Sequence, residues 1–336
     1  MSERIPVTVL TGYLGAGKTT LLNRILSEDH GKRYAVIVNE FGEIGIDADL
    51  ITSSAEELFE MNNGCICCTV RGDLIRTVQG LLATGARFDA ILVETTGLAD
   101  PGPVAQTFFV DHVLQAKTVL DSITTVVDAK HILLRLADSR EAQEQIAFAD
   151  QLVLNKADLV SPAVLVDIET RLRQLNPLAP IHRAQRSNVA LDKLLGRGGF
   201  DLARIASLEP DFLAPAHGEA GHRHDADCDD APDHAHDSDI RSVALTARAP
   251  MDREKISRWL TELVAARGQD ILRAKGIIDV GGDDRRLVFQ AVHMLLEGDW
   301  QRAWRPDEPR YSRLVFIGRN LDREEWQAAF DACTAA

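Results

Sequence analysis

The sequence predicts an α/β protein in which a main domain with a mostly parallel sheet covered by helices precedes a smaller α+β domain. Two observations lead to this prediction. Up to residue 207, short apolar runs rich in β-branched residues alternate with helical stretches, and such alternation is typical of a parallel sheet between helices. After residue 207 the composition becomes polar and acidic, and a different pattern of strands and helices follows.

The elements of the main domain follow from the spacing of apolar residues. Strand candidates are the apolar runs 5–10, 34–38, 90–93, 123–127 and 152–154, and helical stretches cover 18–27, 74–82, 104–114, 139–148 and 163–175. The last helix has a clear start, because Ser161 suits the N-cap and Pro162 suits the first helical position. In a sheet of this kind, ligands bind at the carboxyl ends of the strands.

The rest of the chain predicts a linker and a second domain. Residues 217–239 contain five His, seven Asp, Glu219 and Cys228, with a net charge of −7. A segment with so few apolar residues cannot build a core. We therefore expect a main domain at 1–207, a flexible linker at 208–240 and a second domain at 241–336. The second domain should contain strands at 242–248, 272–280, 287–294 and 314–318, and helices at 253–266 and 323–333.

Composition limits the partners of the protein. The 336 residues carry a net charge of −14, which argues against a general binder of nucleic acid or of anionic membranes. No run of 18 apolar residues occurs, so no membrane span is expected. The first ten residues are too short and too charged for a signal peptide, and a cytoplasmic location is therefore expected.

A phosphate-binding loop follows the first strand. Residues 12–19 match the pattern G-x-x-x-x-G-K-[ST], between a strand and a helix as that pattern requires. The glycines allow backbone N–H groups to surround phosphate, Lys18 can reach the β and γ oxygens, and Thr19 can bind Mg²⁺. A chance glycine-rich turn is the alternative, and the Lys-Thr pair argues against it. We assign nucleotide contacts to Gly12, Gly15, Ala16, Gly17, Lys18, Thr19 and Thr20.

A second motif predicts that the nucleotide is guanine. The strand at 152–154 runs into Asn155, Lys156, Ala157 and Asp158, the pattern N-K-x-D. A carboxylate at Asp158 can accept hydrogen bonds from guanine N1–H and the 2-amino group, which adenine lacks. The stem of Lys156 can lie across the base. The motif alone is weak, because it also occurs in surface turns, but here it follows a phosphate loop.

The strand at 90–93 leads to a third group of candidates. Glu94 directly follows this strand and can lie in the outer coordination shell of Mg²⁺, while the Gly97 N–H can contact a γ-phosphate. The segment 39–47 has the position of a switch that γ-phosphate and Mg²⁺ order. Asp47 is our candidate to orient the attacking water or the metal, and a solvated acidic loop is the alternative. The catalytic candidates are thus Lys18, Asp47 and Glu94.

Three cysteines lie within four residues, at Cys65, Cys67 and Cys68. In a reducing compartment such a group indicates metal binding or redox chemistry rather than disulfides. Three thiolates with a nearby Glu or water make a plausible tetrahedral site for Zn²⁺ or a similar ion. Persulfide or redox chemistry and simple packing of buried thiols are the alternatives. The spacing, next to a glycine, favours a metal.

Together these segments resemble a known family. GYLGAGKTT, NEFGEIGID, NGCICCTVR, ETTGLADP and NKAD occur in this order, and they resemble the CobW-type metallochaperone GTPases. The segments ADPGPVAQTFF, RAKGI, RLVFQAV and RLVFIG resemble its YjiA-like branch, so the resemblance covers nearly the whole chain. Tyr13 stands where the family commonly has Phe.

The resemblance implies the ligands and the partners. It implies that Cys65, Cys67 and Cys68 bind the metal together with Glu40. Zn²⁺ is the expected ion, and Co²⁺ is the next choice because of the family's cobalamin branch. It also implies that the smaller carboxyl-terminal domain contributes to contacts with a client metalloprotein.

The histidines of the acidic segment form a further candidate. Half of the ten histidines of the chain lie there, which favours a weak metal-gathering role over incidental placement. Its affinity should be low, because no fold orients the ligands. The candidate ligands are His217, His222, His224, His234 and His236.

The sequence thus predicts a GTP-hydrolysing metal chaperone in which the nucleotide controls metal affinity. Two alternatives belong to other classes. A regulatory switch that senses metal or redox state would bind partners without delivering metal. A small-molecule kinase would use the same phosphate loop, although the N-K-x-D motif argues against adenine nucleotides.

Overall fold

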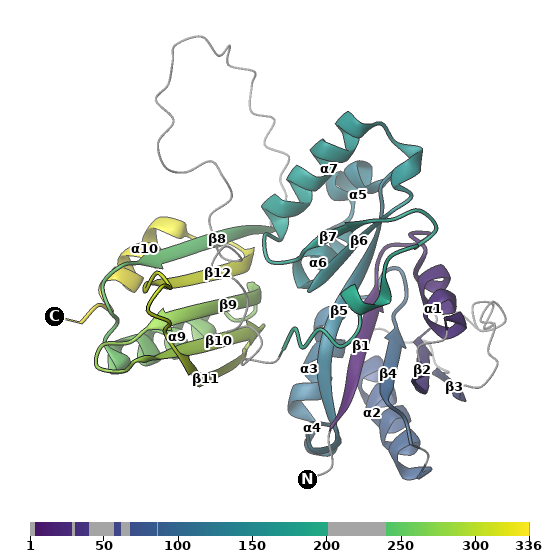
Figure 1. Ribbon diagram of the computed structural model, residues 1–336, viewed down its shortest axis with the longest axis horizontal. Coiled ribbons are helices and arrows are strands. Elements are labelled where there is room, and N and C mark those ends of the chain that lie inside the picture. Colours follow the sequence, from purple (N-terminus) through teal and green to yellow (C-terminus); the bar gives the residue numbers. More distant parts are fainter. Residues whose placement is uncertain are drawn as a thin grey trace.

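The computed structural model describes residues 4–28, 31–39, 57–61, 68–85, 87–200 and 240–335. Figure 1 shows two parts, each built around one sheet. This architecture confirms the predicted fold class. The expected linker at 208–240 lies outside the described residues, apart from Ile240, and its boundaries remain predictions.

The first sheet has seven strands, all parallel, in the order β3-β2-β4-β1-β5-β6-β7. Its strands are β1 Ile5–Thr11, β2 Tyr34–Asn39, β3 Glu57–Met61, β4 Ala90–Glu94, β5 Thr118–Asp128, β6 Gln151–Asn155 and β7 Ile181–Arg183. The two edge strands, β3 and β7, were not predicted. β3 contains two glutamates and β7 has only three residues, so neither has the apolar run of a buried strand.

Helices cover both faces of this sheet, and more of them lie on one face than on the other. The helices are α1 Lys18–Ser27, α2 Cys68–Ala83, α3 Pro101–Val110, α4 His112–Lys117, α5 Ile132–Asp138, α6 Arg140–Phe148 and α7 Pro162–Leu175. Leu21, Leu22 and Ile25 of α1 pack on one face, and α2 to α7 contribute to the core on the other. The single helix predicted at 104–114 was wrong. Asp111 ends α3 there, and its carboxylate caps α4 by accepting from the N–H groups of Val113 and Leu114.

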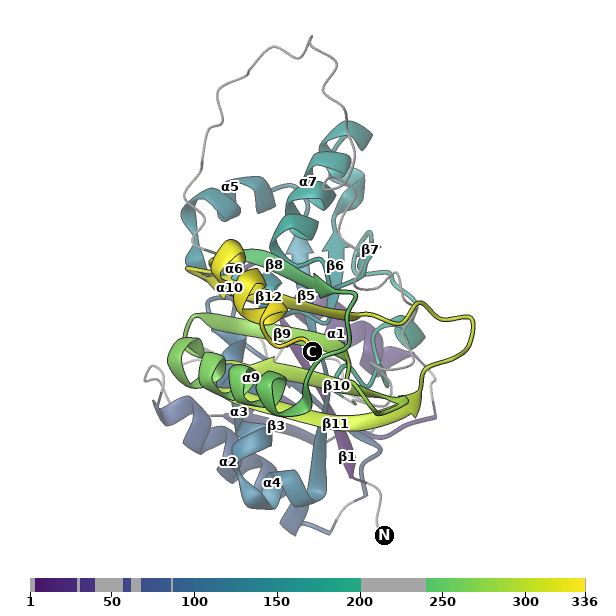
Figure 2. The same cartoon turned by 90° about the vertical axis from the view of Figure 1, so that its left-hand side faces the viewer.

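The second sheet is antiparallel, with the order β11-β10-β9-β12-β8. Its strands are β8 Ile240–Ala247, β9 Ile271–Asp279, β10 Arg285–Val292, β11 Leu295–Ala303 and β12 Ser312–Arg319, with helices α9 Arg253–Arg267 and α10 Arg323–Asp331. Figure 2 shows α9 and α10 in front of this sheet, where they cover one of its faces. The unpredicted strand β11 is a partly exposed edge strand that contains Glu, Asp, Gln and Arg.

The other face of the second sheet packs against the first domain. Leu272, Val288 and Val315 belong to the same apolar cluster as Ile146 and Phe148 of α6. A buried ion cluster lies within this contact. The Asp150 carboxylate accepts from Arg273 at 2.5 Å and from Lys275 at 3.0 Å, and all three side chains are at most 5% exposed. Burial lowers the pKa of Lys275 to about 8, although Asp150 opposes this shift.

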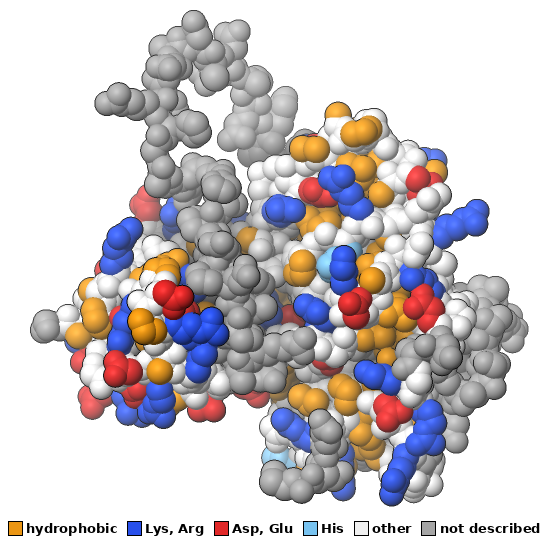
Figure 3. Space-filling view, in the orientation of Figure 1, with side chains coloured by type: hydrophobic (Ala, Val, Ile, Leu, Met, Phe, Trp, Pro, Cys, Tyr) orange, Lys and Arg blue, Asp and Glu red, His pale blue; other side chains and the backbone are white. Residues whose placement is uncertain are grey.

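The described surface carries mixed charge. On the face shown in Figure 3, Lys and Arg side chains are interspersed with Asp and Glu over both domains. Within the described ranges, no helix is long and apolar enough to span a membrane.

Candidate functional site

The phosphate loop lies at the carboxyl edge of the central strands and depends on its glycines. Gly12 has φ 140° and Gly17 has φ 107°, and a Cβ at Gly12 would lie 2.2 Å from the carbonyl oxygen of Val126. A Cβ at Gly17 would lie 2.5 Å from Nδ2 of Asn155. Around Gly15 (φ 73°), no atom of the described residues other than its own and its chain neighbours' lies within 4 Å of the corresponding position. The absence of a side chain at Gly12 and Gly17 therefore lets the loop pack closely against Val126 and Asn155. Gly15 lies on the open side of the loop.

Lys18 folds back over this loop. It is the first residue of α1, is 8% exposed, and donates from Nζ to the carbonyl oxygen of Gly12 at 2.9 Å. The neighbouring Thr20 lies exposed in the first turn of the same helix. The ammonium group thus lies inside the loop that the sequence assigns to phosphate.

Thr19 and Glu94 come together as the magnesium prediction requires. The Thr19 hydroxyl donates to Oε1 of Glu94 at 2.9 Å, and the Glu94 carboxylate at the end of β4 is 3% exposed. Hydroxyl and carboxylate oxygens are the donors that Mg²⁺ prefers. The chemistry of these two residues therefore fits a magnesium ion, and the predicted roles of Thr19 and Glu94 at that ion stay predictions.

The segment after β4 packs directly on the phosphate loop. The Thr95 N–H donates to the Leu10 carbonyl at 2.9 Å, and a Cβ at Gly97 would lie 2.6–2.7 Å from atoms of Leu14. Only glycine allows this approach. The backbone of Gly97 thus lies beside the loop, as expected of a group that contacts a γ-phosphate.

Asn155 connects the phosphate loop to a segment that the sequence did not reveal. Its Nδ2 donates to the Ala16 carbonyl at 2.8 Å, and its Oδ1 accepts from the Ser187 N–H at 2.8 Å. Ser187 in turn donates from Oγ to the Gly17 carbonyl at 3.0 Å. Asn155 therefore links these two loops in this structure, and its predicted contact with the nucleotide stays a prediction.

The segment 184–188 is the part of the site that sequence reasoning missed. Arg186 and Ser187 have positive φ values of 49° and 55°, and the Ser187 side chain is fully buried. Such φ values are uncommon in residues other than glycine and often mark functional turns. The only signal in the sequence is a polar turn after a three-residue strand, which has no recognisable motif.

Lys156 and Asp158 lie where a base could contact them. Lys156, with φ 58°, donates from Nζ to the Gly15 carbonyl at 2.8 Å and to Oδ2 of Asp128 at 2.7 Å. Asp158 is exposed in the short helix η2 (Ala157–Leu159), and its only partner among the described residues is Nε2 of Gln185, at 3.2 Å. The stem of Lys156 thus extends along the phosphate loop, and the Asp158 carboxylate is accessible.

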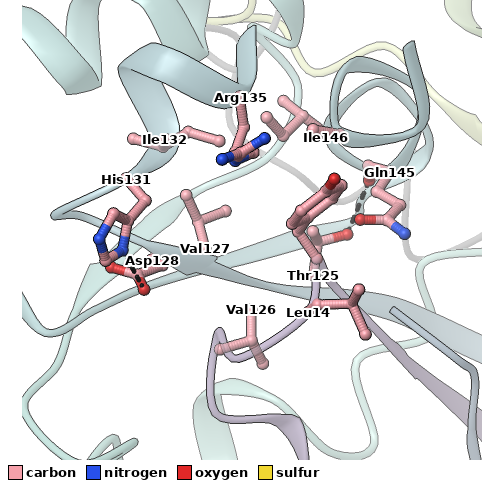
Figure 4. Close-up of a pocket in the computed structure, with 12 residues that line it drawn as sticks. Leu14, Thr125, Val126, Val127, Asp128, His131, Ile132, Arg135, Gln145 and Ile146 are labelled. Carbon is pink, nitrogen blue, oxygen red and sulfur yellow. Dashed lines mark hydrogen bonds and ion pairs between the residues drawn. The ribbon is translucent and has the colours of Figure 1, made fainter. Parts of the chain in front are cut away.

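A cavity of about 270 Å³ adjoins the phosphate loop on the side of α5 and α6 (Figure 4). Leu14, His131, Arg135 and Gln145 are among its lining residues, and the Arg135 guanidinium lies 5.4 Å from the ring centroid of Tyr13. Asp128 also lines it. Although burial alone raises the pKa of Asp128, hydrogen bonds from Lys156 and His131 outweigh burial and hold the pKa below its ordinary value.

Several predicted site residues lie outside the described part of the chain. They are Glu40, Asp47, Cys65, Cys67 and the five histidines His217, His222, His224, His234 and His236. Cys68 begins α2, but its side chain is not described. In the remaining ranges no group of three or more His, Cys, Asp or Glu side chains could hold a metal ion. The metal-site assignment therefore stays a prediction.

Replacing Asp158 with Asn should change the preferred base. An asparagine offers one carbonyl acceptor and one amide donor, so it loses a hydrogen bond to guanine but can pair with the 2-carbonyl of xanthine. We expect affinity for GDP to fall at least about a hundredfold and affinity for XDP to exceed it. Titration with fluorescent GDP and XDP measures both. Asp167→Asn, on the exposed face of α7, is the control, and unchanged GDP affinity in Asp158→Asn would refute the assignment.

Comparisons with known proteins agree with this geometry. The family model described as "CobW/HypB/UreG, nucleotide-binding domain" matches residues 6–183. The model described as "Cobalamin synthesis protein cobW C-terminal domain" matches residues 240–334. The two matches correspond to the two sheets.

Individual relatives cover almost the whole chain. The zinc chaperone YjiA of Escherichia coli K12 is 37% identical over 331 residues, which are 97% of this chain and 98% of the relative. The zinc chaperone CobW of Sinorhizobium sp. is 34% identical, over 98% of this chain and 97% of the relative. The crystal structure of Zn(II)-bound YjiA GTPase from E. coli is 32% identical, covers 99% of this chain and 100% of that chain, and superimposes with a TM-score of 0.77.

Proposed function

This chain belongs to the CobW/HypB/UreG family and is a GTPase, and from this premise we propose that it is a zinc chaperone that delivers its metal to a client protein under the control of GTP. The names of its relatives, zinc chaperone and zinc-regulated GTPase metalloprotein activator, support the zinc part. Co²⁺ is the alternative cargo. We place the protein in the cytoplasm.

One observation carries the nucleotide part of this proposal. Asn155 joins the phosphate loop at Ala16 to the turn at Ser187, so the two predicted nucleotide motifs form one connected edge. On this edge Lys18 would stabilise the β and γ oxygens, and Thr19 with Glu94 would hold Mg²⁺. Mg²⁺ would neutralise the charge that develops between these phosphates. Asp158 would select guanine.

The strand order supports a metal site near the same edge. β2 ends at Asn39, which pairs with Met61 at the end of β3. Glu40 follows the first of these strand ends, and Cys65, Cys67 and Cys68 come shortly after the second. Because parallel strands point the same way, both segments leave the sheet at the edge that carries the phosphate loop. Three thiolates and one carboxylate would suit tetrahedral Zn²⁺.

This placement supports control of the metal by the nucleotide. The segment 39–47 with Asp47 would respond to γ-phosphate and Mg²⁺, and it contains the proposed ligand Glu40. If GTP tightens metal binding, metal must tighten GTP binding by the same factor. The histidines of residues 217–239 would gather metal weakly, and the domain at 241–336 would contact the client.

Replacing Cys65, Cys67 and Cys68 together with Ser should abolish stoichiometric zinc binding. Serine hydroxyls stay protonated and bind Zn²⁺ far more weakly than thiolates. We expect the zinc dissociation constant to rise at least about a thousandfold, because structural zinc sites owe most of their affinity to such ligands. Competitive titration with a chromogenic chelator, with and without a non-hydrolysable GTP analogue, measures this change.

A matched control and a transfer assay complete this test. Cys333→Ser, a substitution in the second domain, should leave zinc affinity unchanged. GDP affinity should survive in both variants. Zinc binding that persists in the triple variant would refute the cysteine site, and identical zinc affinities with and without the analogue would refute nucleotide control. A carrier should also transfer zinc to an apo-metalloprotein faster after GTP hydrolysis, whereas a sensor should not.

A further inference from the structure

Helix α6 lies between the nucleotide edge and the second domain. On its inner side Gln145 is 1% exposed and donates from Nε2 to the carbonyl oxygens of Gly97 and Ala99, each at 3.1 Å. The backbone carbonyl of Gln145 accepts from the Thr125 hydroxyl at 2.7 Å (Figure 4). β5 therefore holds the backbone of α6 at Gln145, and the side-chain amide of Gln145 binds two carbonyl groups of the segment after β4.

The second domain contacts the same helix through other residues. Glu144, the residue before Gln145, pairs with Arg319 at the end of β12. Asp150, two residues after α6, pairs with Arg273 and Lys275 of β9. The Asp150 pairs are buried and the Glu144–Arg319 pair is partly buried. These pairs fix the position of the helix, because separating the buried ones would leave charges without partners.

The hairpin between β10 and β11 adds a third contact. His293, at φ 50°, packs against Phe148 of α6 with ring centroids 5.1 Å apart and ring planes tilted by 52°. Its Nε2 lies 2.7 Å from the position that a Cβ at Gly102 would take, so Gly102 makes room for the imidazole. Gly102 lies in the first turn of α3, three residues after Ala99. The second domain therefore touches both α6 and the start of α3.

We propose that Gln145 is a positioning residue for GTP hydrolysis, and that the second domain takes part by fixing α6. This inference rests on the proposed contact between the Gly97 N–H and the γ-phosphate. The Gly97 carbonyl belongs to the peptide that follows the Gly97 N–H, so holding this carbonyl restricts rotation at Gly97 and limits the direction of that N–H. Such preorganised donors contribute most of their effect in the transition state. Because Gln145 is proposed to act through the Gly97 N–H and not on the nucleotide itself, loss of its amide would let this N–H move.

The test compares two glutamines on one helix. Gln145→Met keeps the length and buried shape of the side chain but removes both hydrogen bonds. Gln143→Met is the matched control, since Gln143 is also buried and donates to the Leu136 carbonyl of α5. We expect kcat for GTP to fall about tenfold in Gln145→Met, because the substitution removes both hydrogen bonds that hold the segment. GDP affinity should stay unchanged and affinity for a GTP analogue should fall severalfold.

A purely structural role would produce a different result. It would lower thermal stability in both variants without changing kcat or the ratio of GTP-analogue to GDP affinity, and that outcome overturns the inference. Arg319→Gln should also lower kcat, but by less than Gln145→Met does. Arg285→Gln breaks an exposed pair with Asp283 and should leave kcat unchanged. Equal kcat values in these two arginine variants would show that the second domain does not contribute to GTP hydrolysis by fixing α6.

Gly97→Ala separates this inference from the function on which it rests. If Gly97→Ala leaves the ratio of GTP-analogue to GDP affinity unchanged, the proposed γ-phosphate contact fails. If Gly97→Ala lowers the ratio and Gln145→Met does not, only the positioning role of Gln145 fails.

Discussion

Lys18→Met is expected to lower kcat/KM for GTP by at least about a hundredfold, the usual loss when one preorganised donor to a reacting oxygen is removed. The ammonium of Lys18 lies inside the phosphate loop, where it donates to the Gly12 carbonyl. On nucleotide binding it would exchange this carbonyl for the β and γ oxygens, whose charge grows during hydrolysis. Methionine fills the same volume without the charge. Phosphate release under saturating and subsaturating GTP measures the effect.

The control for Lys18→Met is Lys117→Met. Lys117 lies exposed at the end of α4, away from the phosphate loop, so its substitution should leave both rates unchanged. Thermal unfolding should differ little between the two variants. Full GTPase activity in folded Lys18→Met would mean that residues 12–19 do not act on the nucleotide as proposed.

Asp150→Asn is expected to destabilise the fold by about 3–5 kcal/mol, the cost of removing one partner from a buried ion cluster. Arg273 and Lys275 would remain buried, at 1% and 5% exposure, without their carboxylate. The Ile123 N–H, which donates to Oδ2 of Asp150 at 3.0 Å, would lose its charged acceptor. Chemical denaturation monitored by fluorescence measures the free energy of unfolding.

Two further variants make this stability prediction specific. Asp283→Asn breaks a surface pair with Arg285 and should leave the free energy of unfolding nearly unchanged, as is usual for surface substitutions. Combining Asp150→Leu with Arg273→Met and Lys275→Met should recover most of the stability, because apolar residues of similar volume often replace buried ions without loss. A single Asp150→Asn variant as stable as the parent would show that the cluster does not hold the domains together.

The predictable part of the site consists of residues whose role depends on their neighbours in the chain. The phosphate loop was recognisable because Gly12, Gly17 and Lys18 must stand at fixed spacing for backbone N–H groups and one ammonium to surround phosphate. Asp158 was recognisable for the same reason, within a four-residue motif at a strand end. Glu94 was found because it directly follows an apolar strand, and the structure places its carboxylate 2.9 Å from the Thr19 hydroxyl.

The missed parts have weak local patterns. β3 and β11 are edge strands with charged residues, and they have no continuous apolar run to reveal them. The helix predicted across 104–114 is broken because Asp111 prefers to cap the following turns, a choice that apolar periodicity does not report. The turn at Ser187 reaches the phosphate loop only because β7 pairs beside β6.

The sequence alone determined the fold class, the phosphate loop and the guanine motif, since each follows from a short pattern of residue types. Only the tertiary structure decided how these parts are joined. Gln145 meets Gly97 across 48 residues, and Arg273 meets Asp150 across 123. Such contacts depend on the order of strands in the sheets and on how the second sheet packs against α6. Local periodicity carries no information about that order, because any arrangement that buries the same apolar faces satisfies it equally well.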